Sequence, residues 1–199
     1  MIKTPVILAS QSPRRKTLLE WAEVPFKVEV VATDESFDAN MEAEKIPIHI
    51  AKAKAVAVKN KLNASGEPIN NIIFLAADTV VVLENEIINK PANREEAISM
   101  LQKLSGQHHR VITGVVILLN EIEVAFSETT HVQFHPLTLQ QIEYYVDHYK
   151  PYDKAGAYAI QEWIGVIGIA SITGDFYNVM GLPVSRVVKE LTTLDHLAS

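Results

Sequence analysis

A short segment near the N-terminus combines hydroxyl groups with two guanidinium groups at the point where a strand-like run becomes helical. Ser10 and Ser12 supply the hydroxyls, and Arg14 and Arg15 follow directly after Pro13. Ser12 is a natural N-cap, and proline suits the first position of a helix. A helix start offers free backbone N–H groups and a positive dipole end, so arginines there are favourable when an anion binds beside them. The segment predicts a polyphosphate-binding turn, with a solvated basic turn on a surface helix as an equally weighted alternative.

Asp78 follows an uninterrupted apolar run over residues 72–77. Such a run is typical of a strand buried on both faces, and a carboxylate at its end is costly unless it lies at a cleft or beside a cation. In open α/β sheets, ligands bind beyond the carboxyl ends of the strands. The position therefore favours a catalytic carboxylate over a structural aspartate that caps a turn.

Further acidic residues follow expected strand ends in the same way. Asp34 and Glu35 come after a strand-like segment at 26–31, and Asp175 follows Ile172-Thr173-Gly174. Mg²⁺ prefers oxygen ligands and bridges readily to substrate phosphates, so three acidic points gathered together would form a metal site. The alternative is that each of these loop carboxylates is simply solvated.

Lysines could complete the cationic half of a triphosphate site. Lys52 and Lys54 lie in an expected helix, and Lys90 precedes Pro91 in a loop. Together with the two arginines they would neutralise a triphosphate. The alternative is that the helix lysines are ordinary solvated side chains.

The composition sets limits on the class of protein. The chain has 199 residues, with 48% hydrophobic and 21% charged residues, a formal net charge of −6 and no cysteine. This balance is that of a globular protein, disfavours wholesale binding to nucleic acid or anionic membrane, and excludes disulfides and cysteine chemistry. We see no signal peptide, no membrane-spanning run, no P-loop and no dinucleotide fingerprint, so we expect one cytoplasmic domain over 1–199.

The elements that must position these residues alternate between strands and helices. We expect strands at 6–9, 26–31, 72–83, 86–88, 111–119 and 122–134, and helices at 46–62, 93–104, 138–149 and 183–194. His108 and His109 are predicted to lie in a turn, and the glycines of the last third to separate short strands. The alternation predicts an α/β or α+β fold with a mixed sheet.

In their order and spacing these segments resemble the Maf family of nucleoside triphosphate pyrophosphatases. The matching segments cover nearly the whole chain and are 10–15, 34–35, 52–57, 77–81, 90–91, 97–106, 113–115, 153–161 and 181–183. The resemblance implies a mixed twisted sheet flanked by helices, with two lobes around a cleft, similar to the inosine triphosphate pyrophosphatase fold. It also implies hydrolysis of a nucleoside triphosphate to the monophosphate and pyrophosphate with Mg²⁺ or Mn²⁺.

The segment 154–161 is similar to that of the family branch acting on dTTP and UTP, rather than the branch acting on 7-methyl-GTP. Carried over by position, Asp78 would be the proton acceptor, and Arg14, Thr79 and Gln161 the specificity determinants. The residues expected to line the phosphate and metal site are Ser10, Arg15, Glu35, Lys52 and Lys90, with Glu35 and Asp78 at the metal.

This chain departs from the family pattern at two places, Gln11 and Glu162-Trp163, where glycine is common. Gln11 would stiffen the first loop, and Glu162-Trp163 would alter the loop on the base side. A regulatory nucleotide-binding protein linked to restraint of cell division is the alternative function, and hydrolysis of modified nucleotides is an alternative activity. The sequence leaves a homodimer open.

Overall fold

The structure is a computed structural model, and it describes residues 2–198. In this part of the chain seven strands form one mixed sheet in the order β2-β1-β3-β5-β6-β7, with β4 paired to β3. β1 is parallel to β2 and β3, whereas β4 and β7 are antiparallel to their partners. The strands are β1 Val6–Leu8, β2 Phe26–Val28, β3 Ile73–Leu83, β4 Glu86–Ile88, β5 His108–Leu119, β6 Ile122–Phe134 and β7 Ile169–Thr173.

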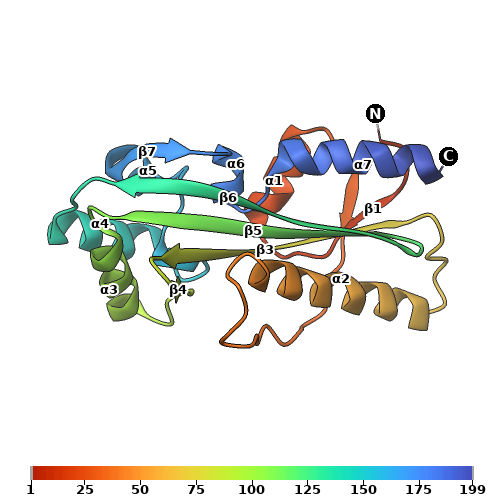
Figure 1. Ribbon diagram of the computed structural model, residues 1–199, viewed down its shortest axis with the longest axis horizontal. Helices are drawn as coiled ribbons and strands as arrows, with labels where there is room; N and C mark the ends of the chain where they lie inside the picture. The colour runs from red at the N-terminus through yellow and green to blue at the C-terminus, as the bar shows by residue number, and fades with distance from the viewer. Residues whose placement is uncertain (1, 199) are drawn as a thin grey trace. The chain divides into compact units, whose positions relative to one another are not determined.

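Helices flank the strands (Figure 1). They are α1 Pro13–Trp21, α2 Ile46–Ala64, α3 Arg94–Leu104, α4 Leu139–Tyr149, the short 3₁₀ helix η1 Ala155–Ala157, α5 Trp163–Gly168, α6 Phe176–Met180 and α7 Val184–Ala198. The predicted mixed sheet flanked by helices is confirmed. Among residues 2–198 we find no helix that has both the length and the apolar character to span a bilayer.

The chain divides into two compact units. The first consists of Met1–Asp78, Thr113–Glu128 and Gly181–Ser199, and the second of Thr79–Ile112 and Thr129–Met180. The boundaries fall inside the long strands β3, β5 and β6. That the whole chain acts as one domain stays a prediction from the sequence.

In the first unit, α2 packs on one face of the sheet. Its Ala51, Ala55 and Val58 share a buried cluster with Phe74 and Ala76 of β3. The intervening residues of β3 point to the opposite face and are buried as well, and α7 lies on that other side (Figure 1). Burial on both faces explains why this strand is an uninterrupted apolar run.

In the second unit, two capped helices pack against the sheet. The Asn93 side chain accepts a hydrogen bond from the backbone N–H of Glu96 at the start of α3, and Thr138 forms a capping box with Gln141 at the start of α4. Both predicted helix starts are confirmed. Tyr145 of α4 is fully buried in the core of this unit.

The glycine-containing segments between α4 and α7 differ in part from the prediction, whereas the last helix is confirmed as α7. We expected short strands between the glycines, but residues 163–168 and 176–180 form the helices α5 and α6, and only β7 is a strand. Gly165 shows why, because a Cβ at this position would lie 1.8 Å from the carbonyl oxygen of Ile160. This glycine permits a close approach of a helix to a turn rather than marking the end of a strand.

His108 and His109 were expected in a turn, but they begin β5. The His109 ring is 2% exposed, and its Nε2 lies 2.7 Å from the hydroxyl of Tyr158. Edge contacts with Phe134 and Tyr158 complete its surroundings. Burial, together with the neighbouring His108, lowers the pKa of His109 to about 4.

We expect this histidine to make the fold sensitive to acid. The pKa of His109 is about 4 in the folded protein and about 6.5 in the unfolded chain. Between these two pH values the unfolded state therefore binds more protons than the folded state. The free energy of unfolding is therefore not reduced by this group above pH 6.5, and it falls as the pH drops toward 4. At pH 5 the loss is about 2 kcal/mol. Urea unfolding at pH 7.5 and pH 5 measures this loss, and His109→Gln should reduce it. The exposed His49 provides the control, because His49→Gln should leave the difference in stability unchanged.

Candidate active site

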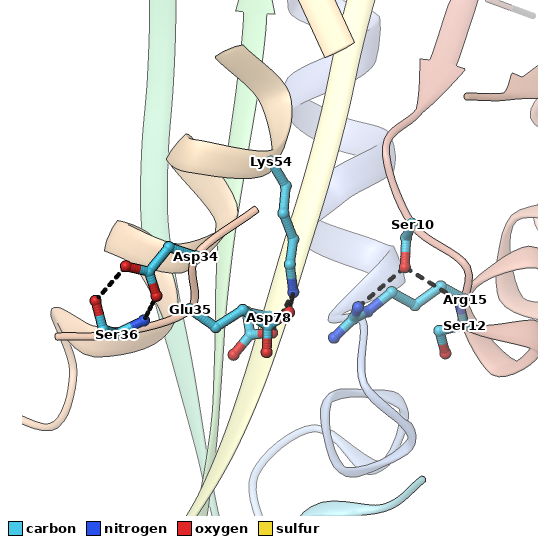
Figure 2. A network of polar contacts seen from close by, with 8 residues as sticks. All are labelled: Ser10, Ser12, Arg15, Asp34, Glu35, Ser36, Lys54 and Asp78. Atoms are coloured by element: carbon cyan, nitrogen blue, oxygen red, sulfur yellow. Dashed lines mark hydrogen bonds and ion pairs between the residues drawn. The ribbon is translucent and has the colours of Figure 1, made fainter. Parts of the chain in front are cut away.

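Asp78 and Glu35 meet at the ammonium group of Lys54 in the first unit (Figure 2). Lys54 Nζ lies 2.8 Å from Asp78 Oδ1 and 2.7 Å from Glu35 Oε1. The Lys54 and Asp78 side chains are 16% and 10% exposed, so water screens this pair only partly. The two carboxylates that the sequence assigned to catalysis and metal binding therefore share one cation.

The helix α2 decides which lysine reaches the site. Residues two apart on a helix point to nearly opposite sides, since each residue turns by about 100°. Lys54 accordingly faces Asp78, whereas the Lys52 ammonium lies 2.9 Å from Glu123 and is about half exposed. The sequence analysis named both lysines as candidates but assigned only Lys52 to the site. Their spacing of two residues on one helix was the signal that only one of them can face Asp78. The role of Lys52 stays a prediction.

The turn between β1 and α1 is organised by the hydroxyl of Ser10. Its Oγ accepts hydrogen bonds from the Ser12 backbone N–H at 3.2 Å and from Arg15 Nη1 at 3.1 Å. Arg15 Nε also donates to the carbonyl oxygen of Gly181 at 2.8 Å. Ser12 stands at the N-cap position as expected, but its side chain makes no capping hydrogen bond.

Arg15 is a buried cation rather than part of a solvated turn. It is 8% exposed, and burial lowers the pKa of its guanidinium, an effect that the nearby carboxylates of Asp78 and Glu35 oppose. Figure 2 shows the guanidinium reaching from α1 toward the Lys54–Asp78 pair. Arg14, in the same turn, is half-buried. Two cations and two carboxylates thus gather at the end of the apolar half of β3.

The other acidic candidates, Asp34 and Asp175, form hydrogen bonds with residues next to them in the chain. Asp34 accepts hydrogen bonds from the backbone N–H and the hydroxyl of Ser36, which lowers the pKa of its carboxyl group (Figure 2). Asp175 Oδ1 accepts from the backbone N–H groups of Tyr177 and Asn178 at α6. Within residues 2–198 no group of three acidic or histidine side chains could hold a metal ion, so the expected triple cluster is not found. Glu35 and Asp78 remain as a pair.

The remaining predicted residues belong to the second unit. Thr79 follows Asp78 in β3 and is half-buried, and the side chains of Lys90 and Gln161 are exposed. Gln161 lies in a tight turn in which the Glu162 backbone N–H donates to the carbonyl oxygen of Ala159 at 3.1 Å. The roles of Thr79, Lys90 and Gln161 in binding stay predictions.

The structure therefore defines an α/β protein that combines a pair of carboxylates sharing one ammonium group with a buried guanidinium at a strand–helix turn, groups whose chemistry suits an anionic ligand. Comparison with known proteins narrows this class. A family model described as Maf-like protein matches residues 5–194. The chain belongs to this family.

Related proteins carry a consistent name. A protein from Cytophaga hutchinsonii named dTTP/UTP pyrophosphatase is 48% identical over 188 residues, which cover 94% of this chain and 83% of that protein. One from Parabacteroides distasonis with the same name is 46% identical over 95% of both chains. The solved Ham1 protein of Staphylococcus aureus matches with a TM-score of 0.44 and 13% identity over 65% of this chain and 71% of that one, a likeness too partial to support a conclusion.

Proposed function

We propose that this protein is a nucleoside triphosphate pyrophosphatase that hydrolyses dTTP and UTP to the monophosphate and pyrophosphate. The observation that best supports the proposal is the convergence of Asp78 and Glu35 on Lys54, in a chain whose relatives are named dTTP/UTP pyrophosphatase. A cytoplasmic location stays a prediction from the sequence, as does the choice between a monomer and a homodimer.

In this proposal the cations of the first turn bind the triphosphate. The substrate carries close to four negative charges near neutral pH, and Arg14 and Arg15 offset part of this charge through charge-assisted hydrogen bonds. Ser10 holds Arg15 in place through its hydroxyl group. Lys90 is a further cation for the phosphates.

Asp78 accepts the proton of the attacking water. The water adds to the α-phosphorus, the bond to the bridging oxygen breaks, and pyrophosphate leaves. Lys54 orients the carboxylate through its ion pair. Thr79 and Gln161 recognise the base, since an amide side chain both donates and accepts hydrogen bonds, as the imide edge of a pyrimidine requires.

A divalent cation fits the donor groups in this site. The carboxylates of Glu35 and Asp78 already converge on one ammonium group, and such oxygens are the ligands that Mg²⁺ and Mn²⁺ prefer. These two residues would hold the cation, and substrate phosphates would complete its ligands. The cation would neutralise charge on the triphosphate.

A panel of triphosphates tests the proposal. We expect dTTP and UTP to be hydrolysed well ahead of ATP, GTP and 7-methyl-GTP, with pyrophosphate and the monophosphate as products. Ion-exchange chromatography identifies the products, and kcat/KM for each substrate measures the preference. Release of orthophosphate and a diphosphate would place the attack at the γ-phosphorus and refute the chemistry. A preference for 7-methyl-GTP would refute only the substrate assignment.

Removal of divalent cations should stop the reaction. EDTA is expected to reduce pyrophosphate release to background, and excess Mg²⁺ or Mn²⁺ should restore it, because the triphosphate needs more positive charge than the side chains provide. Calorimetric titration of Mg²⁺ into the protein and into Glu35→Gln then tests the assigned ligands. Equal Mg²⁺ affinity in both proteins would remove Glu35 from the metal site.

A further inference from the structure

Gln161 lies in a turn that follows buried residues. The side chains of Tyr158, Ala159 and Ile160 are each at most 5% exposed, whereas Gln161 is exposed. The hydrogen bond from the Glu162 N–H to the Ala159 carbonyl closes the turn at 3.1 Å. Gln161 is therefore an exposed polar side chain that directly follows three buried residues.

The hydroxyl group of Tyr145 ties both ends of this turn to α4. It accepts a hydrogen bond from the backbone N–H of Ala159 at 3.2 Å and donates one to Glu162 Oε2. The Tyr145 ring is fully buried in the core of the second unit, so the hydroxyl has little freedom to move. One side chain thus sets the position of the residues on both sides of the Ile160–Gln161 pair.

Lys154 and α5 hold the same turn from other directions. The Lys154 ammonium lies 3.5 Å from Glu162 Oε1 and 2.7 Å from Asp153, and its side chain is 10% exposed. Both carboxylate oxygens of Glu162 are therefore engaged, one by Tyr145 and one by Lys154. Gly165 closes the remaining side, where a Cβ would lie 1.8 Å from the Ile160 carbonyl oxygen.

We propose that Tyr145 and Glu162 are positioning residues for base discrimination, because they hold the 159–162 turn so that the Gln161 amide meets the base in one orientation. The proposal rests on the proposed function. An amide separates bases only when its donor and acceptor ends are held in place, since a mobile amide can turn to suit either edge. Glu162 braces the turn through its contacts with Tyr145 and Lys154.

Two conservative variants and a matched control test this role. Tyr145→Phe keeps the buried ring and removes both hydrogen bonds, whereas Glu162→Gln keeps an oxygen acceptor for Tyr145 and loses the ion pair with Lys154. Tyr149 is the control, because it lies one turn further along α4 and its ring stacks on Tyr145 at 5.0 Å. Tyr149→Phe removes a hydroxyl group from the same helix without altering the anchors of the turn.

We expect Tyr145→Phe to lower the ratio of kcat/KM for dTTP over GTP by about tenfold or more, since a small displacement of a recognition group is costly. Glu162→Gln should lower it less, and Tyr149→Phe should leave it unchanged. A folded Tyr145→Phe protein with the wild-type ratio would overturn the role in discrimination, whatever its melting temperature.

Hydrogen exchange provides a readout that does not depend on activity. The amide of Ala159 should exchange faster in Tyr145→Phe than in the wild type and in Tyr149→Phe, because its acceptor is lost. Unchanged exchange would show that the hydroxyl does not anchor the turn and would overturn the proposal. A wild-type enzyme without a preference for dTTP and UTP would instead contradict the proposed function, and exchange at Ala159 would still decide whether Tyr145 holds the turn.

Discussion

Asp78→Asn is expected to lower kcat for dTTP by roughly 10²–10⁴-fold, because asparagine keeps the size of the side chain but cannot accept a proton from water. The substitution also removes one of the two carboxylates on the Lys54 ammonium. Melting temperature and circular dichroism establish that the variant is folded, and single-turnover assays separate the chemical step from substrate binding. Near-wild-type kcat in the folded variant would remove Asp78 from the mechanism.

Asp34→Asn is the matched control for this experiment. Asp34→Asn removes the same negative charge next to Glu35 in the chain. The Asp34 carboxylate, however, accepts hydrogen bonds from the backbone N–H and the hydroxyl of Ser36 within its own loop. An asparagine keeps an oxygen that accepts the Ser36 N–H, so the loop should persist. We expect kcat within about twofold of the wild type, since no proton transfer is assigned to this group.

Lys54→Met should have the second largest effect, a loss of about 10²-fold in kcat/KM for dTTP. Methionine fills similar space, but it removes the charge that holds Asp78 and Glu35 together, and fixed charges in partly dehydrated sites contribute strongly to catalysis. Steady-state kinetics at saturating Mg²⁺ measure the loss.

Lys52→Met removes the same charge from the same helix two residues away. The Lys52 ammonium contacts Glu123 in an exposed ion pair, and such pairs contribute about 0–1 kcal/mol to stability. We therefore expect a much smaller effect on turnover than for Lys54→Met. A larger loss in Lys52→Met than in Lys54→Met would support the assignment made from the sequence and contradict the one made from the geometry.

The strong local signals of the chain predicted most of the elements. Helix caps and apolar runs depend on residues that are close in the chain, so composition and spacing suffice to locate them. Examples are the caps Asn93 and Thr138 and the apolar run before Asp78. In the last third the final helix was predicted correctly, but residues 163–168 and 176–180 were wrongly expected as strands. Glycines there serve tertiary contacts, such as the approach of Gly165 to Ile160, that no local pattern encodes.

The sequence by itself determined the family and the mixed α/β class, since both follow from the order of its motifs and elements. It also singled out Asp78 as an ionisable group after an apolar run, and the structure places this residue in the middle of β3. Only the tertiary structure decided which groups meet. Lys54 rather than Lys52 reaches Asp78, Arg15 is buried against Ser10 and Gly181, and Glu162 braces the turn of Gln161. Apart from the local contact between Arg15 and Ser10, these contacts join residues that are 17 or more positions apart in the chain. Their partners depend on how helices and turns pack, which local spacing does not specify.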